Sequence, residues 1–186
     1  MSVEETSQTV RDLSGRVQRL EDRFAINDLI ADYCSAIDDR DLEKFLALFT
    51  EDAVLRHKDG AMSVAGKPAI RDYYSARFAA YGVTYHYPHA CRLIFEGRGR
   101  AAGVVTGHAE MGVEGRLVIA AIRYTDRYRQ TDAGWRFAQR ELAFWYYMDL
   151  AELPNGFQDS FRKHYRGERL PAELPETLET FKSWRQ

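Results

Sequence analysis

One carboxylate early in the chain has a position that could serve acid–base chemistry. Asp38 follows apolar residues spaced by three and four from Ile26 to Ile37. That spacing predicts an amphipathic helix, and by helical angle Asp38 lies at the border of its apolar stripe. Because Asp39 or Asp41 can serve as the N-cap of the helix that follows, Asp38 is not needed for that role. It is either a solvated turn carboxylate or a carboxylate that faces a cavity.

A second group of polar side chains lies on two strands. Thr106, His108 and Glu110 alternate with apolar residues, so the two-residue period of a strand predicts that they share one face. That face is either the wet side of a half-exposed sheet or a pocket wall. On the preceding strand, alternation sends His86 and His89 to opposite faces and leaves open which one points inward. A histidine held by a carboxylate is a suitable general base at neutral pH.

No motif predicts a metal or a nucleotide cofactor. His86 and His89 lack a common strand face, and His108 with Glu110 is a weak metal signal. The sequence has no Gly-x-Gly-x-x-Gly loop after a strand, no Walker sequence and no Gly-x-Ser-x-Gly elbow. We therefore expect no metal and no cofactor.

Composition and charge narrow the functional class. The 26 Lys and Arg residues nearly balance 28 Asp and Glu residues, so the net charge of -2 favours neither nucleic acid nor an anionic membrane as a partner. No signal peptide or membrane-spanning pattern is present, and we expect a soluble cytoplasmic protein. Cys34 and Cys91 fit apolar patterns and are predicted to be reduced core residues. His57 and His164 are assigned to the surface.

The elements that position these groups follow an α+β order, with helices before a run of strands. Helical spacing covers residues from about 13 to 38, from 42 to 49 and from 68 to 81, with a short strand at 53–57 and a tight turn at Asp59-Gly60. Four long antiparallel strands are then predicted at 85–95, 101–113, 117–129 and 135–147. The long helix can bury its stripe only by packing on this sheet.

We expect a helical arm in residues 1–20, a main domain in 21–150 and a C-terminal extension in 151–186. In the arm, Leu13, Val17, Leu20 and Phe24 have helical spacing, so this segment is either a surface helix or a contact with a partner subunit. The extension carries apolar anchors but is too open to form a core alone. We expect it to cover its own domain or a neighbouring one, with short helices near 157–165 and 176–184.

A family resemblance joins these observations. Residues 28–54, DLIADYCSAIDDRDLEKFLALFTEDAV, with GKPAIRDYY at 66–74, the histidine-containing strand and the Trp135 strand, resemble the SnoaL-like branch of the nuclear-transport-factor-two-like superfamily over roughly residues 13–148. The resemblance implies a cone-shaped α+β barrel, in which a strongly curved, mostly antiparallel sheet wraps around the long N-terminal helix. It also implies a deep apolar pocket. The superfamily hosts dehydratases, isomerases, cyclases and binders, so fold alone does not decide function.

The motifs are most similar to scytalone dehydratase, bile acid 7α-dehydratase and hexachlorocyclohexane dehydrochlorinase. These enzymes share an Asp on the first long helix and a His at the start of the third strand, which Asp38 and His86 match. Tyr33 matches a pocket tyrosine, and His108 or Glu110 matches a further acid/base group. The resemblance thus implies that Asp38 orients His86, that His86 removes a proton, and that His108 or Tyr33 donates to a departing hydroxyl.

The resemblance also suggests the kind of substrate. The bile acid enzyme has an arginine on its last strand where this chain has Phe144, which argues against a carboxylate or CoA-linked substrate recognised in that way. Aromatic residues around the pocket mouth favour a small apolar cyclic substrate. The predicted substrate-binding residues are Tyr74, His89, Glu110, Phe144 and Tyr146.

We therefore expect a cofactor-independent, dehydratase-like lyase. The alternatives are an enzyme of the ketosteroid-isomerase or polyketide-cyclase type, or a non-catalytic protein that binds a small ligand. Relatives of this branch form dimers or trimers, so we expect a homo-oligomer, with a trimer favoured over a dimer.

Overall fold

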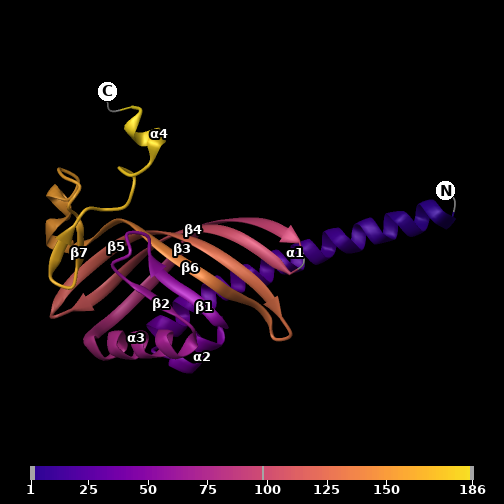
Figure 1. The fold of residues 1–186 in the computed structure, drawn as a ribbon, viewed down its shortest axis with the longest axis horizontal. Coiled ribbons are helices and arrows are strands. Elements are labelled where there is room, and N and C mark those ends of the chain that lie inside the picture. The colour runs from indigo at the N-terminus through magenta and orange to yellow at the C-terminus, as the bar shows by residue number, and fades with distance from the viewer. Residues whose placement is uncertain (1–2, 98, 185–186) are drawn as a thin grey trace.

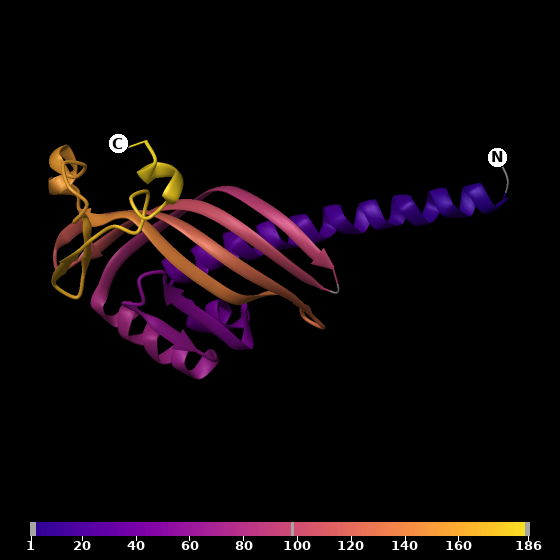
Figure 2. The same ribbon diagram turned by 45° about the horizontal axis from the view of Figure 1, so that its top comes forward.

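A single 36-residue helix, α1 (Val3–Asp38), joins the predicted arm and the predicted main helix without a break (Figure 1). The computed structural model describes residues 3–97 and 99–184 of the chain. Only the C-terminal part of α1 packs on the sheet, where Ile26, Tyr33 and Ile37 are buried. The N-terminal part leaves the body and extends well beyond it (Figure 2).

The end of α1 is closed by a turn at Arg40. Arg40 has a φ of 61°, and backbone hydrogen bonds around it form the pattern of a Schellman motif. Asp41 then caps α2 (Leu42–Ala47), as one of the two predicted caps. Asp38 is therefore left in the last turn of α1 without a capping role.

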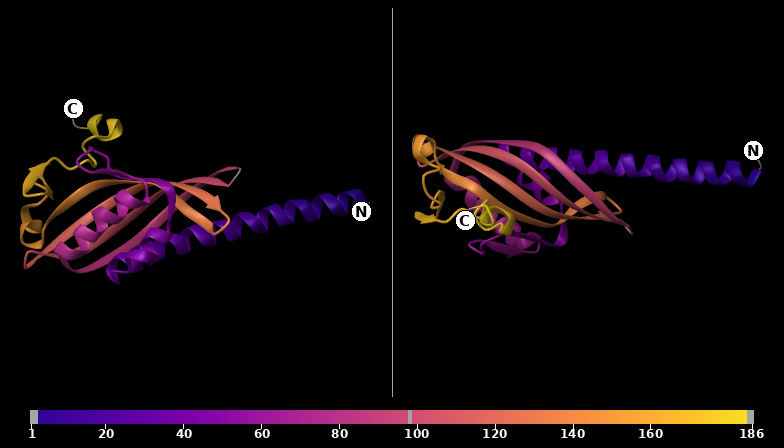
Figure 3. Two further views of the ribbon diagram at one scale, coloured as in Figure 1. Left: turned by 60° about the horizontal axis from the view of Figure 1, so that its bottom comes forward. Right: turned by 90° about the horizontal axis from the view of Figure 1, so that it is seen from above.

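The strands form one eight-stranded sheet that curves around α1 without closing (Figure 3). Its main order is β2-β1-β6-β5-β4-β3, and neighbouring strands are antiparallel except for β1 and β6, which are parallel. The strands are β1 (Phe49–His57), β2 (Ser63–Ala65), β3 (Tyr81–Gly97), β4 (Arg100–Val113), β5 (Arg116–Thr131) and β6 (Gly134–Asp149). With α3 (Lys67–Ala80), which has Pro68 in its first turn, they confirm the predicted α+β cone.

The two faces of β4 differ in burial. Val105, Ala109 and Met111 are buried on the inner face toward α1, whereas His108 and Glu110 are exposed on the outer face. The inner face thus belongs to one continuous apolar core with the buried stripe of α1. Alternation alone predicts this segregation, and the structure shows that the polar set is the outer one.

The C-terminal extension covers its own sheet. It contains a short 3-10 helix, η1 (Leu150–Asn155), a hairpin of β7 (Lys163–Tyr165) and β8 (Glu168–Leu170), and α4 (Glu179–Lys182). The helix predicted near 157–165 is wrong, because β7 pairs with β6 there and the chain turns back through Gly167 with a φ of 81°. Among the described residues, no helix combines the length and apolar character needed to cross a membrane.

Candidate active site

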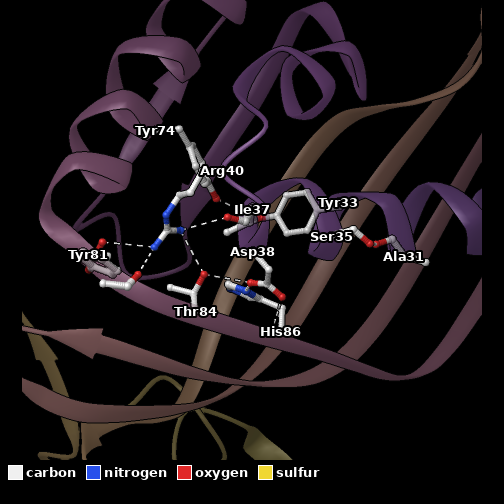
Figure 4. A network of polar contacts seen from close by, with 11 residues as sticks. Ala31, Tyr33, Ser35, Ile37, Asp38, Arg40, Tyr74, Tyr81, Thr84 and His86 are labelled. Carbon is white, nitrogen blue, oxygen red and sulfur yellow. Dashed lines mark hydrogen bonds and ion pairs between the residues drawn. The ribbon is translucent and has the colours of Figure 1, made fainter.

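The carboxylate of Asp38 holds His86 at the junction of α1 and β3 (Figure 4). Its Oδ1 atom lies 2.7 Å from Nδ1 of the imidazole, and its Oδ2 atom accepts the backbone N–H of His86 at 2.8 Å. The hydroxyl of Thr84 also donates to Oδ1, at 3.0 Å. Three hydrogen bonds therefore fix the carboxylate, and one carboxylate fixes both the ring and the backbone of His86.

Arg40 holds this part of β3 against the end of α1. Its guanidinium donates to the hydroxyl of Thr84 at 3.1 Å, to the carbonyl of Tyr81 at 3.3 Å and to the carbonyl of Gly82. It also donates to the carbonyl of Ile37, in the last turn of α1, at 3.0 Å (Figure 4). Since Thr84 in turn donates to Asp38, Arg40 positions the carboxylate through a second residue.

The charge on Asp38 is favoured by its partners. Partial burial alone would raise the pKa of Asp38, but hydrogen bonds from His86 and Thr84 outweigh it and hold the pKa below its usual value. An ionised carboxylate at Nδ1 selects the tautomer of neutral His86 that carries its proton on Nδ1. Nε2 has no hydrogen-bond partner in the described part of the chain, so its lone pair is available.

The ring of His86 forms part of the wall of a cavity inside the cone. The cavity is open to solvent at its mouth. Its apolar walls come from the inner face of the sheet and from the β1–β2 turn: Met62, Ala109, Met111, Ile122, Leu142 and Phe144. The apolar part of this lining is typical of a site for a small apolar molecule.

Two tyrosines supply hydroxyl groups to the same cavity. The hydroxyls of Tyr33 and Tyr74 lie 3.0 Å apart, and burial raises the pKa of both phenols above the usual value. Both are therefore protonated at neutral pH and can donate hydrogen bonds. Tyr33 rests on the guanidinium of Arg140, 4.1 Å from its ring centroid, and Arg140 forms a fully buried ion pair with Asp126 at 3.1 Å.

His57 was assigned to the surface from the sequence, and the structure corrects this. Its side chain lines the cavity and is only 3% exposed, and burial lowers its pKa to about 3. Nδ1 of His57 is buried without a hydrogen-bond partner among the described residues. The signal was present in the sequence, because His57 shares the two-residue period of Ala53 and Leu55, which are buried.

Arg77 is another cavity residue that the sequence reading missed. Its guanidinium donates to the hydroxyl of Tyr73 at 3.3 Å and lies 4.4 Å from the ring centroid of Tyr81. No carboxylate pairs with Arg77 in the described part of the chain. It also borders a wider cleft outside the cavity. Its spacing from Tyr73 and Tyr74, four and three residues along a helix, places all three on one side of α3.

The structure does not bring all the predicted site residues together. Tyr33, Tyr74, His86 and Phe144 line the cavity, with Asp38 behind His86. The predicted residues that lie outside it are His89, His108, Glu110 and Tyr146.

These outside residues belong to the outer side of the sheet, so their predicted place in the pocket is corrected. Nε2 of His89 lies 2.7 Å from Nδ1 of His108, and the tilted ring of Tyr146 lies beside His108 with ring centroids 6.2 Å apart. Alternation puts His108 and Glu110 there, because Ala109 of β4 points inward between them. Tyr146 differs from the cavity residue Phe144 because the β5–β6 register shifts between these two positions. No group of three or more potential metal ligands is found among the described residues.

The fold and its central helix agree with comparisons to known proteins. Residues 18–141 match the model of the SnoaL-like domain, and the chain belongs to this family within the nuclear-transport-factor-two-like superfamily. A sequence search finds no match among curated proteins. The family assignment confirms the resemblance seen in the Asp38 helix and the later strands.

Solved structures show the same fold. The hexachlorocyclohexane dehydrochlorinase LinA-type3 from Novosphingobium barchaimii LL02 is 22% identical, with a TM-score of 0.67 over 73% of this chain and 94% of that chain. A candidate scytalone dehydratase from Novosphingobium aromaticivorans is 22% identical, with a TM-score of 0.67 over 70% and 89% of the two chains. An NTF2-like protein from Novosphingobium aromaticivorans is 29% identical, with a TM-score of 0.60 over 73% and 89%.

Proposed function

We propose that this protein is a cofactor-independent lyase that removes a proton from a small, mostly apolar cyclic substrate and expels a leaving group. The observation that carries the proposal is the hydrogen bond of 2.7 Å between Asp38 and Nδ1 of His86, on an imidazole that lines an apolar cavity. Two of the structures that share the fold bear names of eliminating enzymes, a dehydrochlorinase and a dehydratase, which supports the same reaction class.

In the proposed reaction, Nε2 of His86 takes a proton from a substrate carbon next to a carbonyl. The electron pair of that C–H bond forms the new double bond, and the neighbouring C–O bond breaks with its pair on oxygen. Asp38 stabilises the imidazolium that forms. The imidazolium proton returns to the departing hydroxide, so that the net change is loss of one water molecule. With His108 on the outer face, Tyr33 is the proposed hydrogen-bond donor to the leaving group.

Two further side chains support a substrate that carries an oxygen function. Arg77 presents a guanidinium without a carboxylate partner in the described chain, and Nδ1 of His57 is buried and unpaired there. Such groups recover hydrogen bonds when a ligand oxygen or hydroxyl reaches them. This chain has Phe144 where the bile acid enzyme has an arginine, but Arg77 of α3 brings a guanidinium to the cavity from a different element. We therefore propose that the substrate is a ring system with a carbonyl whose oxygen lies toward Arg77.

Turnover of two probes tests the proposal. The first is a bicyclic β-hydroxy ketone of the tetralone type, which loses water to give a fluorescent naphthol, and the second is a chlorinated cyclohexane, from which chloride is released. We expect wild-type turnover of at least one probe and a loss of about 10²–10⁴-fold in His86→Gln. His108→Gln is the matched control, because it removes a histidine from the outer face, and it should retain wild-type turnover.

Each other outcome of this experiment contradicts the lyase proposal. Failure of the wild-type protein on both probes favours a protein that only binds a ligand. Isomerisation without release of water or chloride favours the ketosteroid-isomerase type, which uses the same kind of base. Near-normal turnover in His86→Gln removes His86 from the mechanism and favours the cyclase alternative.

A further inference from the structure

Helix α1 carries an uncovered apolar stripe that begins on the part projecting beyond the body and ends at Phe24. Its members follow one another at intervals of three and four residues: Val10, Leu13, Val17, Leu20 and Phe24. Each of these side chains is between 49% and 66% exposed. Alternating steps of three and four are the spacing of positions a and d in a heptad repeat, which form the seam between helices of a coiled coil.

The stripe points away from the protein's own body. At about 100° per residue, it lies on the opposite side of α1 from Ile26, Tyr33 and Ile37, which pack on the sheet. Among the described residues, the most N-terminal side chain of α1 with a hydrogen bond to the sheet is Asp22, which accepts the indole N–H of Trp135 at 3.0 Å. The N-terminal part of α1 projects past the sheet as a lone helix (Figure 3). A partner helix therefore has open access to the stripe.

A lone helix of this kind needs a partner. In proteins most of a helix's stability comes from packing of its apolar face rather than from propensity, and Gly15 in the middle of the arm lowers helix propensity further. Because the C-terminal part of α1 is already packed on the sheet, the helix is nucleated there. A partner helix then stabilises the arm by covering its apolar stripe. Val10 and Leu13 also precede residues 18–141 that match the family, so the arm extends beyond the shared fold.

The charges beside the stripe identify the partner and its direction. With Val10, Val17 and Phe24 at position a, the flanking g positions hold Arg16 and Arg23, and the flanking e positions hold Glu21 and Asp28. All four flanking side chains are exposed.

A parallel pair of identical helices places each g residue beside the e residue five positions later in the partner, which joins Arg16 to Glu21 and Arg23 to Asp28. An antiparallel pair would instead place arginine against arginine and acid against acid. None of these four side chains forms an ion pair in the described chain, so each is available to a partner. The charge pattern is thus self-complementary in the parallel arrangement.

We propose that the N-terminal arm forms a parallel, two-stranded coiled coil with the arm of a second copy of this chain. Valine at two a positions with leucine at both d positions favours two strands over three. The assembly is therefore a dimer joined through α1, in place of the trimer that the family resemblance suggests. This inference is independent of the proposed lyase activity, because the seam contains none of the cavity residues.

Cysteine cross-linking tests the register and direction of the pair. In a parallel dimer the two copies of Leu13 face each other, so Leu13→Cys should form a disulfide-linked dimer under mild oxidation. Gly15→Cys is the matched control, since its Cβ would meet nothing within 4 Å and it points away from the seam. Wild-type protein reports any background from Cys34 and Cys91. Equal cross-linking of Leu13→Cys and Gly15→Cys, or none in either, overturns the proposal.

Mass in solution provides the second test. Light scattering of the wild-type chain should give twice the chain mass of 21.5 kDa. Leu13→Glu/Leu20→Glu should halve that mass while the circular dichroism of the sheet stays unchanged, because these residues contact nothing in the core. A wild-type mass other than that of a dimer, or a dimer mass that survives the double substitution, contradicts the proposal.

Discussion

Both carboxylate oxygens of Asp38 form hydrogen bonds with His86: Oδ1 lies 2.7 Å from the imidazole Nδ1, and Oδ2 accepts the backbone N–H at 2.8 Å. The backbone contact fixes where β3 begins relative to α1, and the ring contact fixes the tautomer. A turn carboxylate that served only the backbone would leave the ring free to rotate. The double contact orients the imidazole of His86, which suits Asp38 to positioning a side chain rather than to capping a helix.

Replacing Asp38 by Asn tests this role. Asp38→Asn keeps the shape but removes the charge that stabilises the imidazolium, so turnover should fall, by less than in His86→Gln. The lowered pKa of Asp38 also means that its contribution to stability is present above the unfolded pKa, about 4, and is lost as pH falls through the folded value. Urea unfolding should therefore separate wild type from Asp38→Asn at pH 7 and bring them together at acidic pH. A gap that widens in acid contradicts this assignment.

Substitution of Arg40 tests the hydrogen bonds that hold the Asp38 carboxylate through Thr84. Arg40→Ala and Arg40→Gly both remove the guanidinium that orders Thr84, so both should lower turnover. Only glycine relieves the positive φ of 61°, and Arg40→Gly should be more stable than Arg40→Ala by about 1 kcal/mol. Equal stability in thermal unfolding would show that the turn does not constrain the backbone.

The buried, neutral state of His57 should make the free energy of unfolding depend on pH just below neutrality. Burial depresses its folded pKa to about 3, whereas the unfolded chain has the ordinary value of about 6.5. Between these values the unfolded state binds the extra proton, so the free energy of unfolding should decrease as pH falls below about 6.5. His57→Gln should remove roughly 1–2 kcal/mol of the loss between about pH 6.5 and 5. Parallel pH profiles for the two proteins would refute a buried, neutral His57.

The buried ion pair of Arg140 and Asp126, which lies beside Tyr33, should contribute more to the free energy of unfolding than an exposed ion pair does. Arg140→Met leaves Asp126 charged or protonated without its partner in a fully buried place, and it should cost about 3–5 kcal/mol. The matched control is Arg127→Met, which breaks an exposed pair with Glu96 and should cost at most about 1 kcal/mol. Similar losses for the two variants in chemical denaturation would contradict the importance of burial.

Periodicity predicted the parts of this molecule that repeat a pattern over many residues. The buried stripe of α1 and the four long strands β3 to β6 were found in this way, with ends that differ by a few residues. Alternation also separated His86 from His89 correctly, but it could not say which face of a curved sheet encloses the cavity. That choice depends on how the whole sheet wraps around α1, which is a tertiary property.

The remaining differences come from contacts between distant segments. Arg77 reaches the cavity because α3 packs beside the sheet, and the sequence offered only its helical spacing. The hairpin of β7 and β8 replaces a predicted helix because the part of β6 that follows its pairing with β1 has room for a neighbouring strand, and β7 pairs with it there. Asp38 and His86 were found through the family motif, and their 2.7 Å contact joins residues 48 positions apart in the sequence.

The most direct measurement is deuterium exchange into a tetralone that lacks the leaving hydroxyl, followed by NMR in D₂O. Such a ketone cannot eliminate, so the experiment isolates removal of the proton beside the carbonyl. The wild-type protein and His108→Gln should catalyse exchange at that carbon, and His86→Gln should reduce the rate to the uncatalysed level. Exchange that persists at the wild-type rate in His86→Gln, or disappears in His108→Gln, would contradict a base formed by Asp38 and His86.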